Sequence, residues 1–283
     1  MSTGLLERPV RPAPRPTSAP LPLDTTAPVH PGRIVVHGDF DCPWSYLAFR
    51  RAAILAGAGV EIDWRAVERE AGRRRPTDGF ATVQEEMDHV VASLLPGEQL
   101  PYDLAGFMPR TSATVAAYAE SYAAGVADSV RAVVFESFWM HGVDIGDAKV
   151  LRTLLVDELR CSASASEAVR EWGYCVDVTG GPISTAAWQL VGAWSTEWRE
   201  SGREVTPVVT VPGTAPLHGI DAVDWLGAQI AARGLTPEPP ARPSTPPPSS
   251  RELPGLGWIT EQGGRWLPRR QRVVAAASRA AAG

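Results

Sequence analysis

Cys42 lies where two kinds of sequence pattern meet. The apolar, β-branched residues 34–36 predict a strand, and a stretch compatible with a helix begins directly after Cys42. Pro43 marks the start of that helix, because proline has no N–H to leave unpaired at the first helical position. The unpaired amides and the dipole at a helix N-terminus stabilise a thiolate relative to a thiol. The sequence therefore predicts a reactive cysteine at position 42.

Ser45 occupies the position at which a second cysteine would allow dithiol chemistry. In a Cys-x-x-Cys motif the second thiol resolves the mixed disulfide that the first one forms. Serine cannot do this, so Cys42 would act alone and would need an external thiol for release. The Ser45 hydroxyl can donate a hydrogen bond to the thiolate, whereas the charges of Asp39 and Asp41 disfavour it. The sequence leaves the balance of these effects open.

The alternative interpretation of Cys42 is an inert, buried cysteine, since free cysteine often behaves as a small hydrophobic residue. The same interpretation is favoured for Cys161 and Cys175, which lie far along the chain and belong to no paired motif. The chain has three cysteines and five histidines, with no Cys-x-x-Cys or His-x-x-x-His spacing. We therefore expect neither a disulfide framework nor a metal site.

The segments around Cys42 predict a βαβ unit. Apolar and polar side chains alternate along residues 60–67, which is typical of a half-buried strand. A strand, a crossover helix and a second strand in so short a length give parallel strands. From 77 to about 170 the period becomes helical, with stretches near 111–124, 126–141 and 147–159. These predict an all-helical insertion.

An α/β pattern returns after the insertion. Ser184 or Thr185 can cap a helix on which Trp188, Trp194 and Trp198 are expected to pack against the core. The elements expected beyond it are a strand over 204–211, a short strand over 217–219 and a helix over 222–233.

Composition sets the domain boundaries and excludes some functions. We expect a folded domain over residues 33–235, after a disordered proline-rich segment (1–32) and before a proline-rich linker and basic tail (236–283). A hairpin around Gly263-Gly264 is the less favoured alternative to a disordered tail.

The net charge of −5 is distributed unevenly, with basic ends and an acidic middle, which argues against nucleic-acid binding. The apolar runs are shorter than the roughly 20 residues of a spanning helix, and the N-terminal segment does not resemble a secretory signal. The sequence thus predicts a cytoplasmic protein that does not bind a membrane.

Three motifs in this order resemble the DsbA-like branch of the thioredoxin superfamily. Residues 39–48, Asp-Phe-Asp-Cys-Pro-Trp-Ser-Tyr-Leu-Ala, resemble its active-site turn. Residues 135–147 resemble the end of its helical insertion, and residues 205–209 resemble its cis-proline loop. The resemblance covers about residues 33–233 and implies an α/β, thioredoxin-like fold, with the helical insertion between an N-terminal βαβ unit and a C-terminal ββα unit.

The resemblance also implies the site residues. Cys42 and Ser45 would be catalytic, and a cis Thr206–Pro207 bond would turn the Thr206 backbone towards Cys42. The residues expected to bind the thiol or substrate are Pro43, Trp44, Thr206 and Pro207.

The branch includes FrnE-type oxidoreductases, 2-hydroxychromene-2-carboxylate isomerases and kappa-class glutathione transferases, so three functions stay open. The favoured one is a monothiol thiol-disulfide oxidoreductase. The second is a thiol-dependent isomerase or transferase, in which Cys42 holds the sulfur of glutathione as a serine does in those relatives. The third is a redox-inactive module that binds a thiol or a peptide. We expect no tightly bound cofactor, a low-molecular-weight thiol (glutathione or an equivalent) as co-substrate, and a small thiol or disulfide as partner. A homodimer is left open.

Overall fold

The computed structural model describes residues 32–69, 80–101, 106–160, 162, 164–202 and 204–237, together with the backbone of two short strands near the C-terminus. The elements of the main part are, in chain order, β1 (Ile34–Gly38), α1 (Pro43–Gly57), β2 (Ile62–Ala66), α2 (Phe80–Ala92), α3 (Ser112–Ala123), α4 (Ala127–Trp139), α5 (Ala148–Arg160), α6 (Glu167–Trp172), α7 (Thr185–Glu200), β3 (Val208–Thr210), β4 (Leu217–His218) and α8 (Ile220–Ala232).

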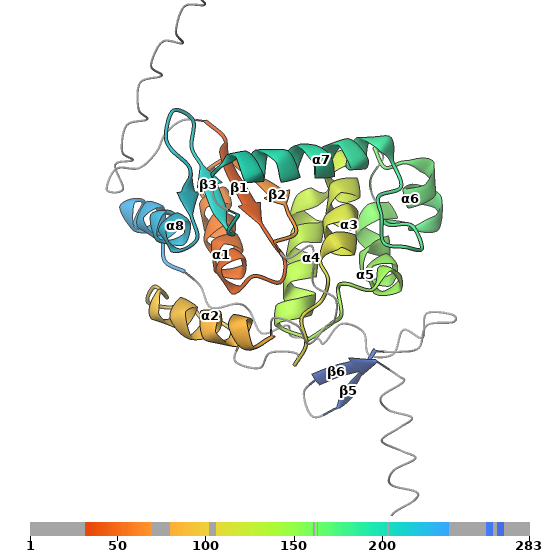
Figure 1. Ribbon diagram of the computed structural model, residues 1–283, viewed down its shortest axis with the longest axis horizontal. Helices are drawn as coiled ribbons and strands as arrows, with labels where there is room; N and C mark the ends of the chain where they lie inside the picture. Colours follow the sequence, from red (N-terminus) through yellow and green to blue (C-terminus); the bar gives the residue numbers. More distant parts are fainter. Residues whose placement is uncertain are drawn as a thin grey trace, which may run out of the picture.

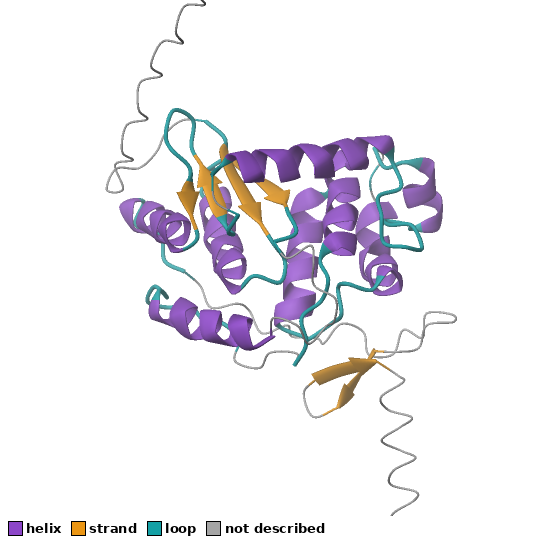
Figure 2. Cartoon of the chain, in the orientation of Figure 1, coloured by secondary structure: helices purple, strands orange, loops and turns teal. Residues whose placement is uncertain are grey.

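Four of the described strands form one sheet in the order β2-β1-β3-β4. β1 runs parallel to β2, while β3 is antiparallel to both β1 and β4. The helices α2 to α6 stand between the first βαβ unit and the closing ββα unit, and α3 to α6 gather to one side of the sheet (Figure 1). This mixed architecture, with helices around a small sheet (Figure 2), confirms the fold class expected from the sequence.

The alternation along β2 places different chemistry on its two faces. Trp64 points towards the helical insertion, where its ring meets Phe135 of α4 edge-on at 5.5 Å. Phe135 in turn stacks on Phe49 of α1 at 4.7 Å. The neighbouring Asp63 and Arg65 point to the opposite face, since successive side chains of a strand alternate. Aromatic packing therefore joins α1, α4 and the sheet on one side.

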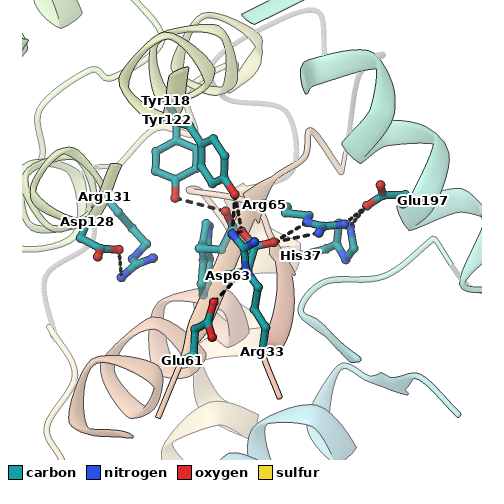
Figure 3. A network of polar contacts seen from close by, with 11 residues as sticks. Arg33, His37, Glu61, Asp63, Arg65, Tyr118, Tyr122, Asp128, Arg131 and Glu197 are labelled. Atoms are coloured by element: carbon teal, nitrogen blue, oxygen red, sulfur yellow. Dashed lines mark hydrogen bonds and ion pairs between the residues drawn. The ribbon is translucent and has the colours of Figure 1, made fainter. Parts of the chain in front are cut away.

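A polar network joins the other face to α3 and α7 (Figure 3). Asp63 accepts hydrogen bonds from Tyr122 of α3 at 2.8 Å and from Arg65. Arg33 donates to the Tyr122 hydroxyl at 2.7 Å and pairs with Asp63 at 3.1 Å. Arg65 also forms an ion pair with Glu197 of α7. These contacts fix both helices on the strands that frame the turn at Cys42.

Gly38, at the end of β1, is required by the close approach of Trp64. A Cβ atom at this position would lie 2.3 Å from Cζ2 of the Trp64 ring. No side chain fits there unless the buried tryptophan moves, so glycine allows β1 to run directly over the indole.

One tryptophan of α7 does not lie where the sequence predicted. Trp194 and Trp198 are buried, but Trp188 is 57% exposed. The residues of α7 that face the core are Ala187, Trp194 and Trp198. Trp188 follows Ala187 directly and is rotated by about 100° from that stripe, so it points outward.

The described strands near the C-terminus are β5 (Ile259–Gln262) and β6 (Arg265–Pro268), which pair antiparallel. They correspond to the hairpin around Gly263-Gly264 that the sequence offered as the less favoured alternative. The remaining residues of the two predicted tails lie outside the described part of the chain.

Candidate thiol site

Cys42 is the residue directly before α1, and Pro43 is the first residue of the helix. β1 ends at Gly38, so a four-residue turn carries the chain from the strand to the helix. The turn is closed by a hydrogen bond from the Cys42 N–H to the Asp39 carbonyl oxygen at 3.3 Å. Cys42 is fully buried. The local sequence thus places the sulfur at a helix start, as predicted, but out of contact with solvent.

The closing half of the domain brings Thr206 to this sulfur. The Cys42 thiol donates a hydrogen bond to the Thr206 carbonyl oxygen, with 3.4 Å between the two atoms and 164 residues between them in sequence. The peptide bond between Thr206 and Pro207 is cis. β3 begins at the next residue and pairs its Val208 with His37 of β1, which carries the loop alongside the turn. The arrangement matches the geometry that the resemblance implied for this loop.

Ser45 supports the turn through its side chain. Its hydroxyl accepts a hydrogen bond from the Asp39 N–H at 3.2 Å, and it is fully buried. The group of Ser45 that favours a thiolate at Cys42 is its backbone N–H. We had expected the hydroxyl to donate to the sulfur. In the structure the hydroxyl stabilises the turn, and the backbone N–H of Ser45 lowers the pKa of the Cys42 thiol.

Pro43 and Trp44 complete the turn. Pro43 is buried in the first turn of α1, and Trp44 is partly buried and packs against the hydrophobic core. The predicted site residues of the two motifs thus lie together at the C-terminal end of β1. His37 points elsewhere: its Nε2 lies 3.5 Å from a carboxylate oxygen of Glu197.

Burial is the largest influence on the Cys42 thiol, and it raises the pKa. The charge of Arg69 opposes this by lowering the pKa, while the charge of Glu86 raises it. Sequence reasoning assigned the repulsive role to Asp39 and Asp41. It missed Arg69, in the loop after β2, and Glu86 of α2, because neither belongs to a motif and only the folded chain brings them to the turn.

Asp39 is a buried carboxyl beside the thiol. Burial and the nearby Asp41 raise the pKa of Asp39 well above its ordinary value. One of its oxygens accepts a hydrogen bond from the Arg69 N–H at 2.6 Å. A carboxyl with a raised pKa holds its proton longer, so Asp39 carries less negative charge near Cys42 than its residue type suggests.

Among the described residues, Cys175 forms no disulfide with Cys42. Cys175 is a free, buried thiol in the loop after α6, and burial raises its pKa to about 12. Cys161 lies outside the described residues. No group of three potential metal ligands is found among the residues searched, and no described helix combines the length and apolar character needed to cross a bilayer.

One family model and several solved structures are similar to this chain. Residues 33–169 match the model of the DSBA-like thioredoxin domain. A solved structure of a probable DsbA oxidoreductase from Streptomyces coelicolor is 19% identical, with a TM-score of 0.47, covering 71% of this chain and 90% of that one. A 2-hydroxychromene-2-carboxylate isomerase is 19% identical, with a TM-score of 0.49 and coverages of 72% and 96%. The cytosolic disulfide reductase DsbM from Pseudomonas aeruginosa is 14% identical, with a TM-score of 0.49 and coverages of 72% and 100%. No protein of curated function matches the sequence.

Proposed function

We propose that this protein, which carries a DsbA-like thioredoxin domain, is a thiol-disulfide oxidoreductase that works through the single thiol of Cys42. The observation that supports this most directly is the position of the sulfur. It lies at the N-terminus of α1 and 3.4 Å from the Thr206 carbonyl oxygen, beside the cis bond to Pro207. An extended thiol ligand at this position can pair its backbone with Thr206 while its sulfur meets Cys42.

The reaction needs two exchanges because Ser45 cannot resolve a mixed disulfide. In the first, the Cys42 thiolate attacks one sulfur of a disulfide, forms a Cys42–S–S–R bond and releases the other half as a thiolate. In the second, the thiolate of an external small thiol attacks this mixed disulfide and restores the Cys42 thiolate. One half of the substrate disulfide thus leaves as a thiol, and the other half ends in a disulfide with the external thiol.

The neighbours of Cys42 receive roles under this proposal. The Ser45 backbone N–H assists the thiolate, while its hydroxyl keeps the turn in shape. Thr206 and Pro207 align the substrate backbone, and Trp44 shapes access to the sulfur. Glutathione or an equivalent small thiol is the proposed co-substrate, and the cytoplasm, where such thiols stay reduced, is the proposed compartment.

The burial of Cys42 favours a second candidate, a thiol-dependent isomerase or transferase. Burial raises the pKa of Cys42 and its thiol donates to Thr206, and both effects favour the protonated form. A protonated Cys42 can hydrogen-bond the sulfur of a bound small thiol instead of attacking it. The two candidates differ in one event, the formation of a covalent bond at Cys42.

The deciding experiment treats the full chain with oxidised glutathione and identifies the modified peptide by mass spectrometry. A turnover assay then follows thiol release from a second small disulfide in excess reduced glutathione, because exchange between reduced and oxidised glutathione gives no net reaction. We expect a mixed disulfide on Cys42 that the reduced thiol releases. Cys42→Ala should lose the adduct and the turnover, whereas Cys175→Ala should keep both. Ser45→Cys should add an internal disulfide with Cys42 on oxidation.

Binding of reduced glutathione without any adduct at Cys42 would instead support the isomerase or transferase. Binding with neither an adduct nor turnover of either kind would identify a redox-inactive module.

A further inference from the structure

Arg69 is fixed to the turn that carries Cys42. Its backbone N–H donates to the Asp39 carboxylate at 2.6 Å, and the Asp39 carbonyl oxygen accepts from the Cys42 N–H at 3.3 Å. The Arg69 side chain is only 13% exposed. A guanidinium stays protonated throughout the physiological range, and the charge of Arg69 acts on the Cys42 thiol.

Glu86 of α2 binds the same guanidinium. The distance between Arg69 Nη1 and Glu86 Oε1 is 2.7 Å, and the Glu86 side chain is 23% exposed. Ion pairs with so little solvent contact interact more strongly than surface pairs, because water screens them less. The two residues come from separate segments, the loop after β2 and the first half of α2.

The segment that follows α2 is itself anchored to the helix that starts at Cys42. Arg51 of α1 donates to both carboxylate oxygens of Glu98 and to the Ser93 carbonyl oxygen at 2.7 Å. Arg51 and Glu98 are both nearly inaccessible to solvent. The position of Glu86 relative to Cys42 is therefore set by a second, buried ion pair.

The charged groups around the thiol act in opposite directions. Arg69 favours the thiolate and Glu86 disfavours it. Asp39 and Asp41 lie in the same turn, and the raised pKa of Asp39 reduces its charge there. Thr206 contributes a neutral carbonyl oxygen, and Ser45 a neutral N–H. Arg69 is the cation that acts on Cys42 here, and Glu86 and Asp41 both act on its charge.

We propose that Arg69 stabilises the Cys42 thiolate and that Glu86 limits this effect by pairing with the same guanidinium. The inference rests on the proposed function of Cys42 as a nucleophile and adds how its reactivity is set. Loss of the thiol proton to solvent leaves an anion that shares Arg69 with Glu86. Arg69 and Glu86 are then positioning residues whose removal changes the thiol in opposite directions.

The test is the rate of alkylation of Cys42 by iodoacetamide as a function of pH, followed on the Cys42 peptide of the full chain. At pH 7 we expect Arg69→Gln to react about threefold to tenfold more slowly, because the loss of a nearby opposite charge lowers the thiolate fraction. Glu86→Gln should react faster by a similar factor. Arg69→Lys should retain most of the wild-type rate.

Opposite changes in alkylation rate would show that the two residues act through their charges. If the ion pair had only a structural role, its loss would expose the thiol and raise the rate in both variants. Glu61→Gln is the matched control: Glu61 pairs with Arg33 at 3.7 Å on the far end of the strand, and its loss should leave the rate unchanged. Circular dichroism would show that the variants are folded.

Changes of the same sign in Arg69→Gln and Glu86→Gln, or no change in either, would overturn the inference. Alkylation needs no turnover, so the outcome is separate from that of the glutathione assay. Opposite rate changes without a mixed disulfide would refute the oxidoreductase and retain the charge pair. A mixed disulfide without the rate changes would support the oxidoreductase and refute the role of the charge pair.

Discussion

At the scale of single residues, the site combines groups that favour opposite states of one sulfur. The helix start, the Ser45 N–H and the Arg69 charge favour the thiolate, whereas burial and Glu86 favour the thiol. Burial has the largest effect, and it raises the pKa of the Cys42 thiol. A bound substrate that brings hydrogen-bond donors to the sulfur would shift this balance towards attack.

Asp39 should make the stability of the protein depend on pH. Its pKa is raised in the folded state, so the folded protein keeps a proton that the unfolded chain releases above about pH 4. The unfolded state then binds fewer protons, and the free energy of unfolding falls as the pH rises from about 4 through the folded pKa. Asp39→Asn should flatten this slope.

The measurement is urea unfolding of the wild type and Asp39→Asn at several pH values. Equal slopes for the two proteins over that window would show that Asp39 does not titrate as described.

The residues of the site differ in how far the sequence could predict them. Cys42 and Thr206 were found because each stands in a motif of known layout. Arg69 and Glu86 were not found, because their effect depends on which loop and helix reach the turn. The weight of burial on the Cys42 pKa was also beyond the sequence, since desolvation depends on everything that covers a group.

At the scale of elements, β1 and β2 pack closely because a glycine of β1 leaves room for a large side chain of β2. Gly38 leaves the space that the Trp64 indole occupies, and Trp64 in turn contacts Phe135 of the helical insertion. Alternation along residues 60–67 predicted β2, because each face of a strand meets one environment. The prediction for Trp188 was wrong because Trp188 lies about 100° from the face of α7 that Ala187, Trp194 and Trp198 share.

Gly38→Ala should destabilise the fold by about 1–3 kcal/mol, because the added methyl group overlaps the Trp64 ring and forces a buried side chain to move. Gly192→Ala is the matched control. Gly192 lies within α7, and an added Cβ there would have nothing within 4 Å. We expect this variant to gain about 0.4–1 kcal/mol.

Chemical denaturation of both variants measures the difference. A Gly38→Ala protein as stable as the wild type would mean that the strand and the indole separate at little cost.

At the scale of the whole molecule, one buried arginine joins two helices and the segment that follows a third. Arg51 of α1 binds Glu98 after α2 and donates to the Val223 carbonyl oxygen of α8 at 2.7 Å. Sequence patterns predicted α1 and α8 separately, and the two-part α/β order predicted that they belong to one domain. The contact between them could not be predicted, because a buried ion pair between distant residues leaves no periodic signal.

Removal of one partner of this pair should cost far more than removal of both. Glu98→Gln leaves the Arg51 charge buried without its counter-ion, which we expect to destabilise the protein by about 3–5 kcal/mol. The double variant Arg51→Met with Glu98→Leu should recover much of this loss, because no charge is then left buried. A double-mutant cycle in urea gives the coupling, and a Glu98→Gln protein of wild-type stability would contradict the expectation.

The hydrogen bond between Cys42 and Thr206 also has a consequence for folding during synthesis on the ribosome. The two residues are 164 positions apart, and a chain grows by roughly 5–20 residues per second, so about 10 to 30 s separate their synthesis. Over that interval β1 has only β2 as a neighbour, and the edge that β3 will occupy stays open. The nascent thiol is likewise without its carbonyl partner, and the site exists only after Thr206 has left the exit tunnel.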